Sequence, residues 1–397
     1  MATSGTRAPG KDLTLIGGGH AHVFVLKRFG QARLDGVRLT LISPNSHALY
    51  SGMLPGLIAD HYTIDETHID LERLAHFAGA RFIHDEAVGL DLAQRRVLCR
   101  DRLPQSFDVL SIDIGSMPHT DAVPGAAEST VPIKPIGRFL DRWTVLRDRV
   151  MARAEPSRIG IVGAGAGGVE ILLAAQLALQ RRLATAGRSR DAPEFHLFSD
   201  TSDILPGHNG RARAMFRRVL AERGVRLHLG RAVIRAASSR VTTSDGTEHG
   251  LDEILWVAAS GAAPWLLPSG LRLDESGFIA VDATLRSMSD DRVFAAGDIA
   301  SSASHPLPKA GVFAVRQGPI LAENLRRALL GRDLRPYVPQ RQFLSLISTG
   351  DKSAIASRGS WAAGGPGVVG RALWQLKDRI DRRFIRTFNE LPRPNRN

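Results

Sequence analysis

The sequence predicts an α/β fold of two parallel-sheet domains, one nested within the other, followed by a C-terminal amphipathic helical segment. Two observations predict the domains. A short apolar strand, a glycine-rich turn and a helix follow one another twice in the chain, and each helix leads into a further strand. The nesting is indicated by a third observation, because no low-complexity linker divides the 397 residues.

Both units have the strand, helix, strand order of a Rossmann-like domain. In the first unit the predicted segments are a strand at 13–16, a turn at 17–22, a helix at 23–29 and a strand at 37–43. In the second unit they are a strand at 159–162, a turn at 163–168, a helix at 169–179 and a strand at 195–199. A long apolar helix at 313–330 and a buried strand at 293–298 complete the predicted core.

The two glycine-rich turns predict two dinucleotide sites. A pyrophosphate is a diffuse dianion that backbone N–H groups at a helix N-terminus bind well. The chain must approach the phosphates closely, so the turn requires residues without a Cβ. Gly17 and Gly19 meet this need in the first unit, and Gly163, Gly165 and Gly168 meet it in the second. One such turn is weak evidence, and two in the same context outweigh the alternative of ordinary glycine turns.

Three positions qualify this prediction. His22 stands where a third glycine is usual, so we expect a displaced helix or an imidazole that contacts the phosphates. Ser43 ends the next strand, where a ribose-binding carboxylate is usual, and its hydroxyl can still bond a ribose. Asp200 has that position in the second unit and would repel a 2′-phosphate, which favours NADH, although nearby arginines leave NADPH open. His20 and His22 have no third ligand nearby in sequence, so no metal site is expected.

Composition narrows the function classes. The net charge is +12, but no zinc-finger spacing or helix-turn-helix pattern accompanies it, so we expect no nucleic-acid partner. A single cysteine, Cys99, excludes an intramolecular disulfide and a dithiol redox pair. It fits a reducing compartment, and we expect a cytoplasmic protein. The sequence contains no run of 18 or more apolar residues, so no membrane span is expected.

Four segments carry a resemblance to a known family. They are Ile16–His22, Tyr50–Gly56, Lys309–Gln317 and Asp378–Phe384. In them the chain resembles FAD-dependent flavoproteins of the pyridine nucleotide-disulfide oxidoreductase superfamily. Within it, the chain is similar to type II NADH dehydrogenases and sulfide:quinone oxidoreductases, and most similar to the flavoprotein domain fused to selenophosphate synthetase in some bacteria. The likeness covers essentially the whole chain.

The resemblance implies a domain organisation. Residues 1–118 and 262–345 would form a discontinuous FAD-binding domain, with Gly115 and Gly261 at its two crossovers into the inserted domain. Residues 119–261 would bind NAD(P)H, and 346–397 would form a C-terminal region with an amphipathic helix.

It also implies roles for individual residues. Asp298 would bond the ribityl chain of FAD, Gly297 would permit its close approach, and Gly52 would lie beside the isoalloxazine. Glu170 would lie near both the nicotinamide and the flavin, and Gln317 would border a quinone pocket; these two are the candidate catalytic residues. The plainer alternatives are a helix-capping role for Asp298 and a dipole-favoured helix charge for Glu170.

The absent dithiol decides the expected mechanism. A hydride would pass from nicotinamide to flavin, and the electrons would then leave directly for a quinone or another small acceptor. Arg316 stands where the NADH dehydrogenases often have a glutamine, which keeps other acceptors open. The alternative function is a flavin-binding module with a regulatory or selenium-linked role.

The C-terminal segment 369–391 has one apolar stripe among basic residues. The stripe consists of Val369, Leu373, Leu376, Ile380, Phe384 and Phe388, with Trp374 beside it. Such a helix could lie on the inner face of an anionic membrane, dock on the protein body or pair with a second copy as a homodimer. We favour docking.

Overall fold

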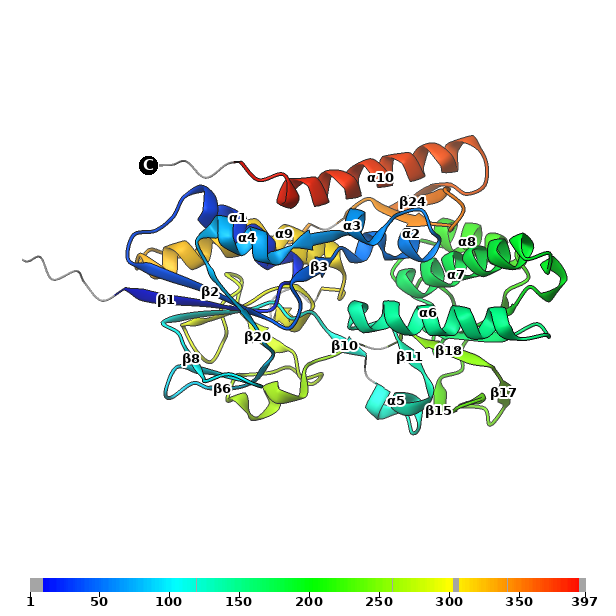
Figure 1. Cartoon of the computed structure of the whole chain (residues 1–397), viewed down its shortest axis with the longest axis horizontal. Coiled ribbons are helices and arrows are strands. Elements are labelled where there is room, and N and C mark those ends of the chain that lie inside the picture. The colour runs from blue at the N-terminus through cyan, green and yellow to red at the C-terminus, as the bar shows by residue number, and fades with distance from the viewer. Residues whose placement is uncertain (1–9, 119, 259, 303–306, 341, 393–397) are drawn as a thin grey trace, which may run out of the picture.

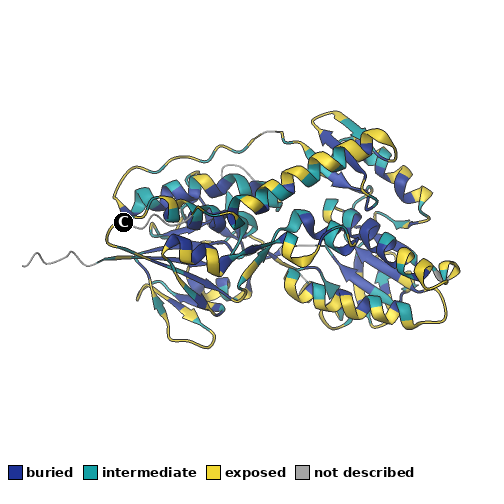
Figure 2. Ribbon diagram, turned by 45° about the horizontal axis from the view of Figure 1, so that its top comes forward, coloured by how far each residue is buried: buried dark blue, intermediate teal, exposed yellow. Residues whose placement is uncertain are grey.

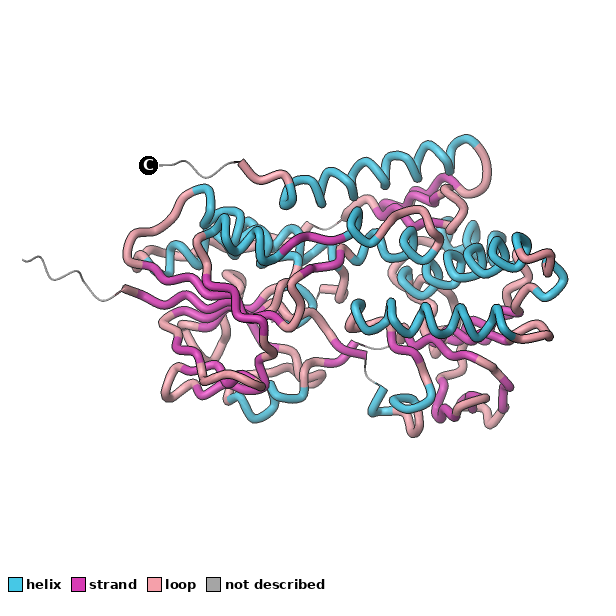
Figure 3. Tube along the Cα trace, in the orientation of Figure 1, coloured by secondary structure: helices cyan, strands magenta, loops and turns pink. Residues whose placement is uncertain are grey.

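Two parallel sheets lie side by side, and one long helix extends along both of them (Figure 1). The fold is described from a computed structural model, over residues 10–118, 120–258, 260–302, 307–340 and 342–392. Figure 3 shows the two groups of strands with helices packed above them. This arrangement confirms the predicted fold class, two Rossmann-like units followed by a C-terminal helix.

The first sheet contains five parallel strands in the order β21-β9-β1-β2-β5. They are β1 (Lys11–Ile16), β2 (Val37–Ser43), β5 (Arg81–His84), β9 (Val109–Ile112) and β21 (Val293–Ala295). One face packs against α1 (His20–Gln31), α4 (Leu71–Ala78) and α9 (Gly311–Leu329). The other face packs against an antiparallel sheet of β6 (Ala87–Asp91), β7 (Arg96–Cys99) and β8 (Gln105–Ser106). The predicted strand at 37–43 is therefore β2, and the predicted helix at 23–29 is a part of α1.

The second sheet has the order β11-β18-β12-β13-β14 and is also parallel. Its strands are β11 (Val131–Pro132), β12 (Arg158–Val162), β13 (Glu194–Phe198), β14 (Arg226–His228) and β18 (Glu253–Trp256). One face packs against α6 (Ile136–Ala152), α7 (Ala166–Thr185) and α8 (Gly210–Glu222). The other is covered by an antiparallel sheet of β15 (Val233–Ala237), β16 (Arg240–Thr243) and β17 (Glu248–Gly250).

Two antiparallel strands join the halves. β10 (Met117–Pro118) leaves the first half and pairs with β19 (Ser260–Gly261), which returns to it. Consequently β21 pairs with β9 in the first sheet although the whole second sheet separates them in sequence.

The shorter elements connect these layers. They are β3 (His47–Leu49), η1 (Ser51–Met53), α2 (Leu54–Ile58), α3 (Ile64–Thr67), β4 (His68–Asp70), η2 (Thr120–Ala122), α5 (Ala126–Ser129), η3 (Ser189–Asp191), η4 (Pro264–Ser269), β20 (Ile279–Val281), η5 (Gly297–Ile299) and β22 (Ala300–Ser302).

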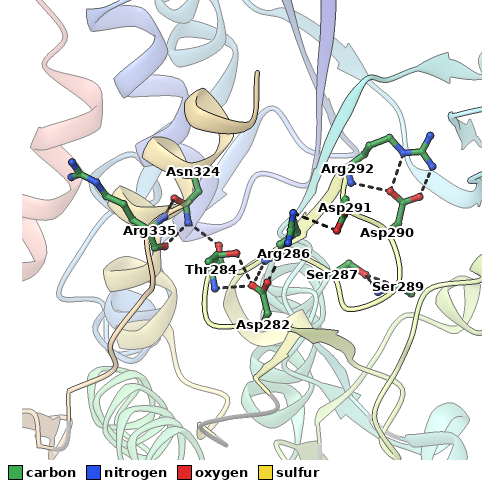
Figure 4. A network of polar contacts seen from close by, with 10 residues as sticks. All are labelled: Asp282, Thr284, Arg286, Ser287, Ser289, Asp290, Asp291, Arg292, Asn324 and Arg335. Atoms are coloured by element: carbon green, nitrogen blue, oxygen red, sulfur yellow. Dashed lines mark hydrogen bonds and ion pairs between the residues drawn. The ribbon is translucent and has the colours of Figure 1, made fainter. Parts of the chain in front are cut away.

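A buried amide fixes α9 against the loop before β21 (Figure 4). Asn324 Nδ2 donates to the carbonyl oxygens of Thr284 and Arg335, each at 2.8 Å, and its Oδ1 accepts from Arg335 N at 2.8 Å. Asp282 closes the same loop by accepting from Thr284 N at 2.7 Å. This network holds the helix that carries Gln317 over the first sheet.

The C-terminal region contains an antiparallel sheet of three strands and a long helix. The elements are β23 (Ser345–Ser348), β24 (Ala354–Arg358), β25 (Trp361–Gly364) and α10 (Val368–Asn389). The predicted docking of this helix on the body is present, because Trp374, Phe384, Ile385 and Phe388 pack into the first core. The docked face departs from the predicted stripe at Val369, Leu376 and Ile380.

Val369, Leu376 and Ile380 face solvent, with 58%, 41% and 47% of their surface exposed. Figure 2 shows this outer side of α10 as largely exposed, in contrast to the buried strands of both sheets. The buried face of α10 therefore differs from the predicted one, because it includes Asp381 as well as apolar side chains.

Candidate active site

The first glycine turn lies between β1 and α1, against the end of β9. Gly17 has a φ of +92°, which favours glycine. A Cβ at Gly17 would collide with the backbone of Asp113, and one at Gly19 would collide with the Asp113 carboxylate. Glycine is therefore required at both positions by a close approach, as the sequence predicts. On this side of the turn, the group that approaches is Asp113 at the end of β9.

His22 fills the third-glycine position from the sheet side. Its Nδ1 lies 2.6 Å from Gly17 O and its Nε2 lies 2.8 Å from Ser111 Oγ, and the residue is 0% exposed. A carbonyl oxygen only accepts, so Nδ1 carries the proton and Nε2 accepts from the Ser111 hydroxyl. Burial lowers the pKa of His22 to about 4. Both ring nitrogens are engaged by protein groups, so the ring anchors the start of α1 to β9, and a phosphate contact stays a prediction that this geometry does not favour.

Asp113 is a site residue that the sequence analysis missed. Its Oδ2 accepts from the N–H groups of Ala21 at 2.7 Å and His22 at 3.0 Å, at the N-terminus of α1. Burial raises the pKa of Asp113 to about 7. The available signal was an acidic residue directly after the buried strand β9.

Ser43 ends β2, at the position predicted for a ribose contact. Its hydroxyl donates to Asn45 O at 2.8 Å and accepts from Asn45 N at 3.3 Å, so it closes a local turn. A ribose contact by this hydroxyl stays a prediction.

Asp298 lies in the turn after β21, beside a lysine that comes from the second half. Asp298 Oδ2 accepts from Lys134 Nζ at 2.7 Å and from Ser116 Oγ at 3.0 Å. Burial opposes ionisation of Asp298, but Lys134 outweighs it and lowers the pKa. Lys134 was also missed, because no local pattern links it to a residue so far along the chain.

Gln317 supports that same turn. Its Oε1 accepts from Gly297 N at 2.7 Å, and Gly297 has a φ of +72°. Both residues line a small pocket together with Asp298, Lys309 and Phe313. Gln317 thus lies at the predicted flavin region, and its place at a quinone pocket stays a prediction.

The second glycine turn repeats the first between β12 and α7. Gly163 has a φ of +113°, and a Cβ there would lie 2.7 Å from Ala258 N. A Cβ at Gly168 would collide with Gly163 O, so this glycine allows α7 to begin close to β12. Asp200 is exposed just beyond the end of β13, where a ribose contact is predicted.

Open space adjoins one glycine of the second turn and the glycine that follows Asp113 by two residues. Nothing lies within 4 Å of where a Cβ would stand at Gly115 or at Gly165. Gly115 and Gly261 lie at the paired crossovers, where Gly261 is the partner of Met117. The second turn therefore fits a pyrophosphate at the N-terminus of α7, and at α1 a pyrophosphate would lie beside the Asp113 carboxyl, which already accepts from two N–H groups there.

A buried charged cluster lies where both halves meet α10. Glu170, on α7, accepts from Ser348 N at 2.7 Å. Lys377 Nζ donates to Gly52 O and to Asp381 Oδ2, each at 2.6 Å. The side chains of Lys377 and Asp381 are only 13% and 6% exposed. The structure thus brings predicted residues of both halves, Glu170 and Gly52, to one cluster completed by the C-terminal helix.

Electrostatics within this cluster are strongly coupled. Burial raises the pKa of Glu170 to about 7, although Lys377 acts to lower it. Burial acts to lower the pKa of Lys377, but Asp381 and Glu170 outweigh it and the pKa is raised. Tyr50 hydrogen-bonds to Asp381, and burial raises its pKa. The ring of Tyr50 stacks on Phe384 with centroids 4.4 Å apart.

Two further properties concern the described residues alone. None of their helices combines the length and the apolar character that crossing a bilayer requires. Nor do those residues bring together three or more histidine, cysteine or acidic side chains in a manner that suits a metal ion.

Known proteins are similar to this chain over most of its length. The chain is 27% identical over 353 residues to the NADH dehydrogenase-like protein YutJ of Bacillus subtilis, an alignment that covers 87% of this chain and 91% of the relative. It is 24% identical over 379 residues to demethylphylloquinone reductase NdbB of Synechocystis, covering 92% and 91%.

Solved structures share the fold at low identity. The sulfide:quinone oxidoreductase of Aquifex aeolicus superposes with a TM-score of 0.77 at 16% identity, covering 97% of this chain and 93% of that one. NDH2 of Plasmodium falciparum in complex with NADH gives a TM-score of 0.79 at 13% identity, covering 96% and 99%. The family model described as pyridine nucleotide-disulphide oxidoreductase matches residues 11–318, most of the chain. The protein is therefore an oxidoreductase that belongs to the pyridine nucleotide-disulphide oxidoreductase family.

Proposed function

We propose that the protein is an FAD-dependent NAD(P)H oxidoreductase that reduces a quinone or a similar small acceptor without a redox-active disulfide. The observation that carries the proposal is a buried cluster in which Lys377 bonds to Gly52 O of the first half and interacts electrostatically with Glu170, which follows the glycine turn of the second half. FAD would lie on the first turn and NAD(P)H on the second. When bound, FAD supplies the two-electron chemistry that connects nicotinamide and acceptor.

The domain boundaries form part of the proposal. Residues 1–118 and 262–345 would bind FAD, 119–261 would bind NAD(P)H, and 346–397 would close the site. Pairing of β10 with β19 at the junctions supports this division. Asp200 supports NADH over NADPH, because a carboxylate at the end of β13 would repel a 2′-phosphate.

The protein's own residues would mainly position the bound groups and deliver protons to the acceptor. Gln317 and Asp298 support the turn after β21, beside which the flavin would lie. Glu170 has a pKa of about 7 and can hold a proton near neutral pH. A quinone takes up two protons on reduction, so a buried carboxyl with this pKa suits proton delivery to it.

The relatives support a quinone as acceptor. One curated relative is a demethylphylloquinone reductase. Cys99 is the only cysteine, so no cysteine pair of this chain can mediate electron transfer from the flavin.

The decisive experiment is an anaerobic titration of the purified flavoprotein with NADH and with NADPH. We expect flavin absorbance to bleach, with NADH the more effective donor, and to recover when a quinone is added. Protein that cannot be reconstituted with FAD would overturn the proposal. Protein that binds FAD but resists both nucleotides would favour the alternative, a flavin-binding module with a regulatory or selenium-linked role.

We also propose that α10 brings the protein to an anionic membrane surface. Exposed Val369, Leu376 and Ile380 lie on the helix with exposed Arg371, Arg379 and Arg383 among them. An apolar face rimmed by arginines suits a bilayer interface that carries negative headgroups. Quinones partition into bilayers, so this contact would place the acceptor near the site.

A further inference from the structure

Asp113 occupies hydrogen-bond donors that a pyrophosphate would otherwise attract. The first four N–H groups of a helix have no partner within the helix, and anions bind there. In α1 the carboxylate of Asp113 takes two of them, Ala21 N at 2.7 Å and His22 N at 3.0 Å. The residue is only 2% exposed, so water does not moderate its charge.

The carboxyl is wedged between the two turns expected to hold FAD. A Cβ at Gly19 would collide with the carboxylate, and one at Gly297 would stand 2.5 Å from its Oδ1. Only glycine at these positions leaves the carboxyl its space. Asp113 is therefore built into the cradle and is not a surface acid that could turn away.

The charges around Asp113 leave it without a counter-ion. Asp298 lies nearby and raises the pKa of Asp113, but its own charge is balanced by Lys134 Nζ at 2.7 Å. His20 and His22 are both neutral near pH 7, because burial lowers each pKa to about 4. Within the described part of the chain, no lysine, arginine or histidine forms an ion pair with Asp113.

We infer that Asp113 couples FAD binding to the uptake of a proton, so that its carboxyl is neutral when the pyrophosphate lies on α1. The inference rests on the proposed function, since it assigns FAD to the first glycine turn. Two anions on one helix terminus in a buried site repel each other strongly, and protonation of one removes the repulsion. A neutral carboxyl still accepts from Ala21 N and gains an O–H that can donate to a phosphate oxygen.

The sign of the pH effect follows from linkage. Burial raises the pKa of Asp113 to about 7 before FAD binds, and a bound pyrophosphate would raise it further. Below pH 7 the carboxyl is already protonated, and FAD binds at full affinity. Above pH 7 each binding event must take up a proton, so affinity falls by at most about tenfold per pH unit.

The test is FAD binding to the apoprotein of the full chain, followed by quenching of flavin fluorescence. From about pH 6 to about pH 8.5 we expect the Kd to rise roughly tenfold or more, with uptake of about one proton per FAD at the higher pH. Proton uptake is measured by calorimetry in buffers of different ionisation enthalpy. In D113N the Kd should become nearly independent of pH and lie roughly tenfold below that of the unmodified protein at about pH 8.5.

Two control variants isolate the residue. Asp108, at the opposite end of the same strand, also accepts a backbone N–H, from Asp12 N at 2.8 Å. D108N should keep the pH dependence. Glu170 is a second carboxyl with a pKa of about 7, and E170Q should also keep the pH dependence of FAD binding.

The outcomes separate this inference from the proposed function. A Kd that is flat with pH and no proton uptake in the unmodified protein would overturn the inference and leave FAD binding intact. A pH dependence that is unchanged in D113N, or lost in D108N or E170Q, would also overturn it. Failure to bind FAD at any pH would overturn both. The proton uptake of the unmodified protein decides the question even if D113N folds poorly.

Discussion

Lys377 Nζ, on the last helix, donates a 2.6 Å hydrogen bond to Gly52 O, 325 residues earlier in the chain. The same ammonium bonds to Asp381 and acts on the pKa of Glu170. One buried cation thus connects the expected flavin side of the first half, the glycine turn of the second half and the C-terminal region. α10 is therefore a part of the site as well as an outer layer.

We predict that K377M destabilises the protein and impairs acceptor reduction. Loss of the cation leaves Asp381 buried without its partner, which costs about 3–5 kcal/mol of unfolding free energy. The double variant K377M/D381N removes both charges and should recover a large part of that loss. Urea unfolding measures the stabilities. Equal stabilities of the single and double variants would contradict the coupling.

We predict a pH limb in quinone reduction that depends on Glu170. Burial raises the pKa of Glu170 to about 7, so the carboxyl is protonated below pH 7 and loses its proton above it. Reduction of a water-soluble quinone should therefore slow as the pH rises through about 7. E170Q should be slower by roughly a hundredfold or more and show no such limb.

Ferricyanide provides the control for that prediction, because its reduction requires no proton. Its rate should show no limb in either protein. If the quinone limb persists unchanged in E170Q, Glu170 does not deliver the proton.

We predict that G168A weakens nicotinamide binding and spares the flavin. A Cβ at Gly168 would collide with Gly163 O, so the start of α7 must move away from β12. The KM for NADH should rise roughly tenfold or more, since about 1.4 kcal/mol corresponds to a factor of ten. The flavin spectrum should not change. G167A is the matched control, because the nearest atom to its Cβ outside the helix backbone and the neighbouring residues is Val257 Cγ1, at an ordinary 3.9 Å.

Local patterns explain why much of the fold could be predicted. Strand β2 has its predicted bounds, Val37–Ser43, because its apolar pattern is a property of adjacent residues. The glycine turns could be located for the same reason, since their backbone demands act within a few residues. α7 is longer than the predicted helix at 169–179 and continues to Thr185. The prediction ended early because the basic composition near Arg181 is typical of an exposed loop.

The rest depends on contacts between distant segments. Asp113 and Lys134 could not be placed from the sequence, because the partners of Asp113 lie on the distant helix α1 and the partner of Lys134 lies in the other half. The face of α10 was wrong because hydrophobic periodicity treats charged residues as solvent-facing. The buried Lys377–Asp381 pair violates that rule, and the stripe through Leu376 and Ile380 is turned outward.

The exposed stripe of α10 gives the last prediction. L376E and I380E should each weaken binding to vesicles that contain anionic lipid by roughly tenfold or more, since each removes a large apolar side chain worth about 1.5–3 kcal/mol on burial. Activity with a soluble acceptor should persist, because neither side chain is buried in the site. Vesicle co-sedimentation measures the binding.

Gln375, exposed on the same helix, provides the charge-matched control. Q375E introduces the same negative charge but removes no apolar side chain, so its loss of binding should be smaller. Substitution is preferable to truncation of α10, because truncation would also remove Lys377 and Asp381 and abolish the site. Vesicle binding that is equal in Q375E and I380E would show that charge alone controls the contact. Binding that is unaffected by all three substitutions would exclude this face of α10 as the membrane surface.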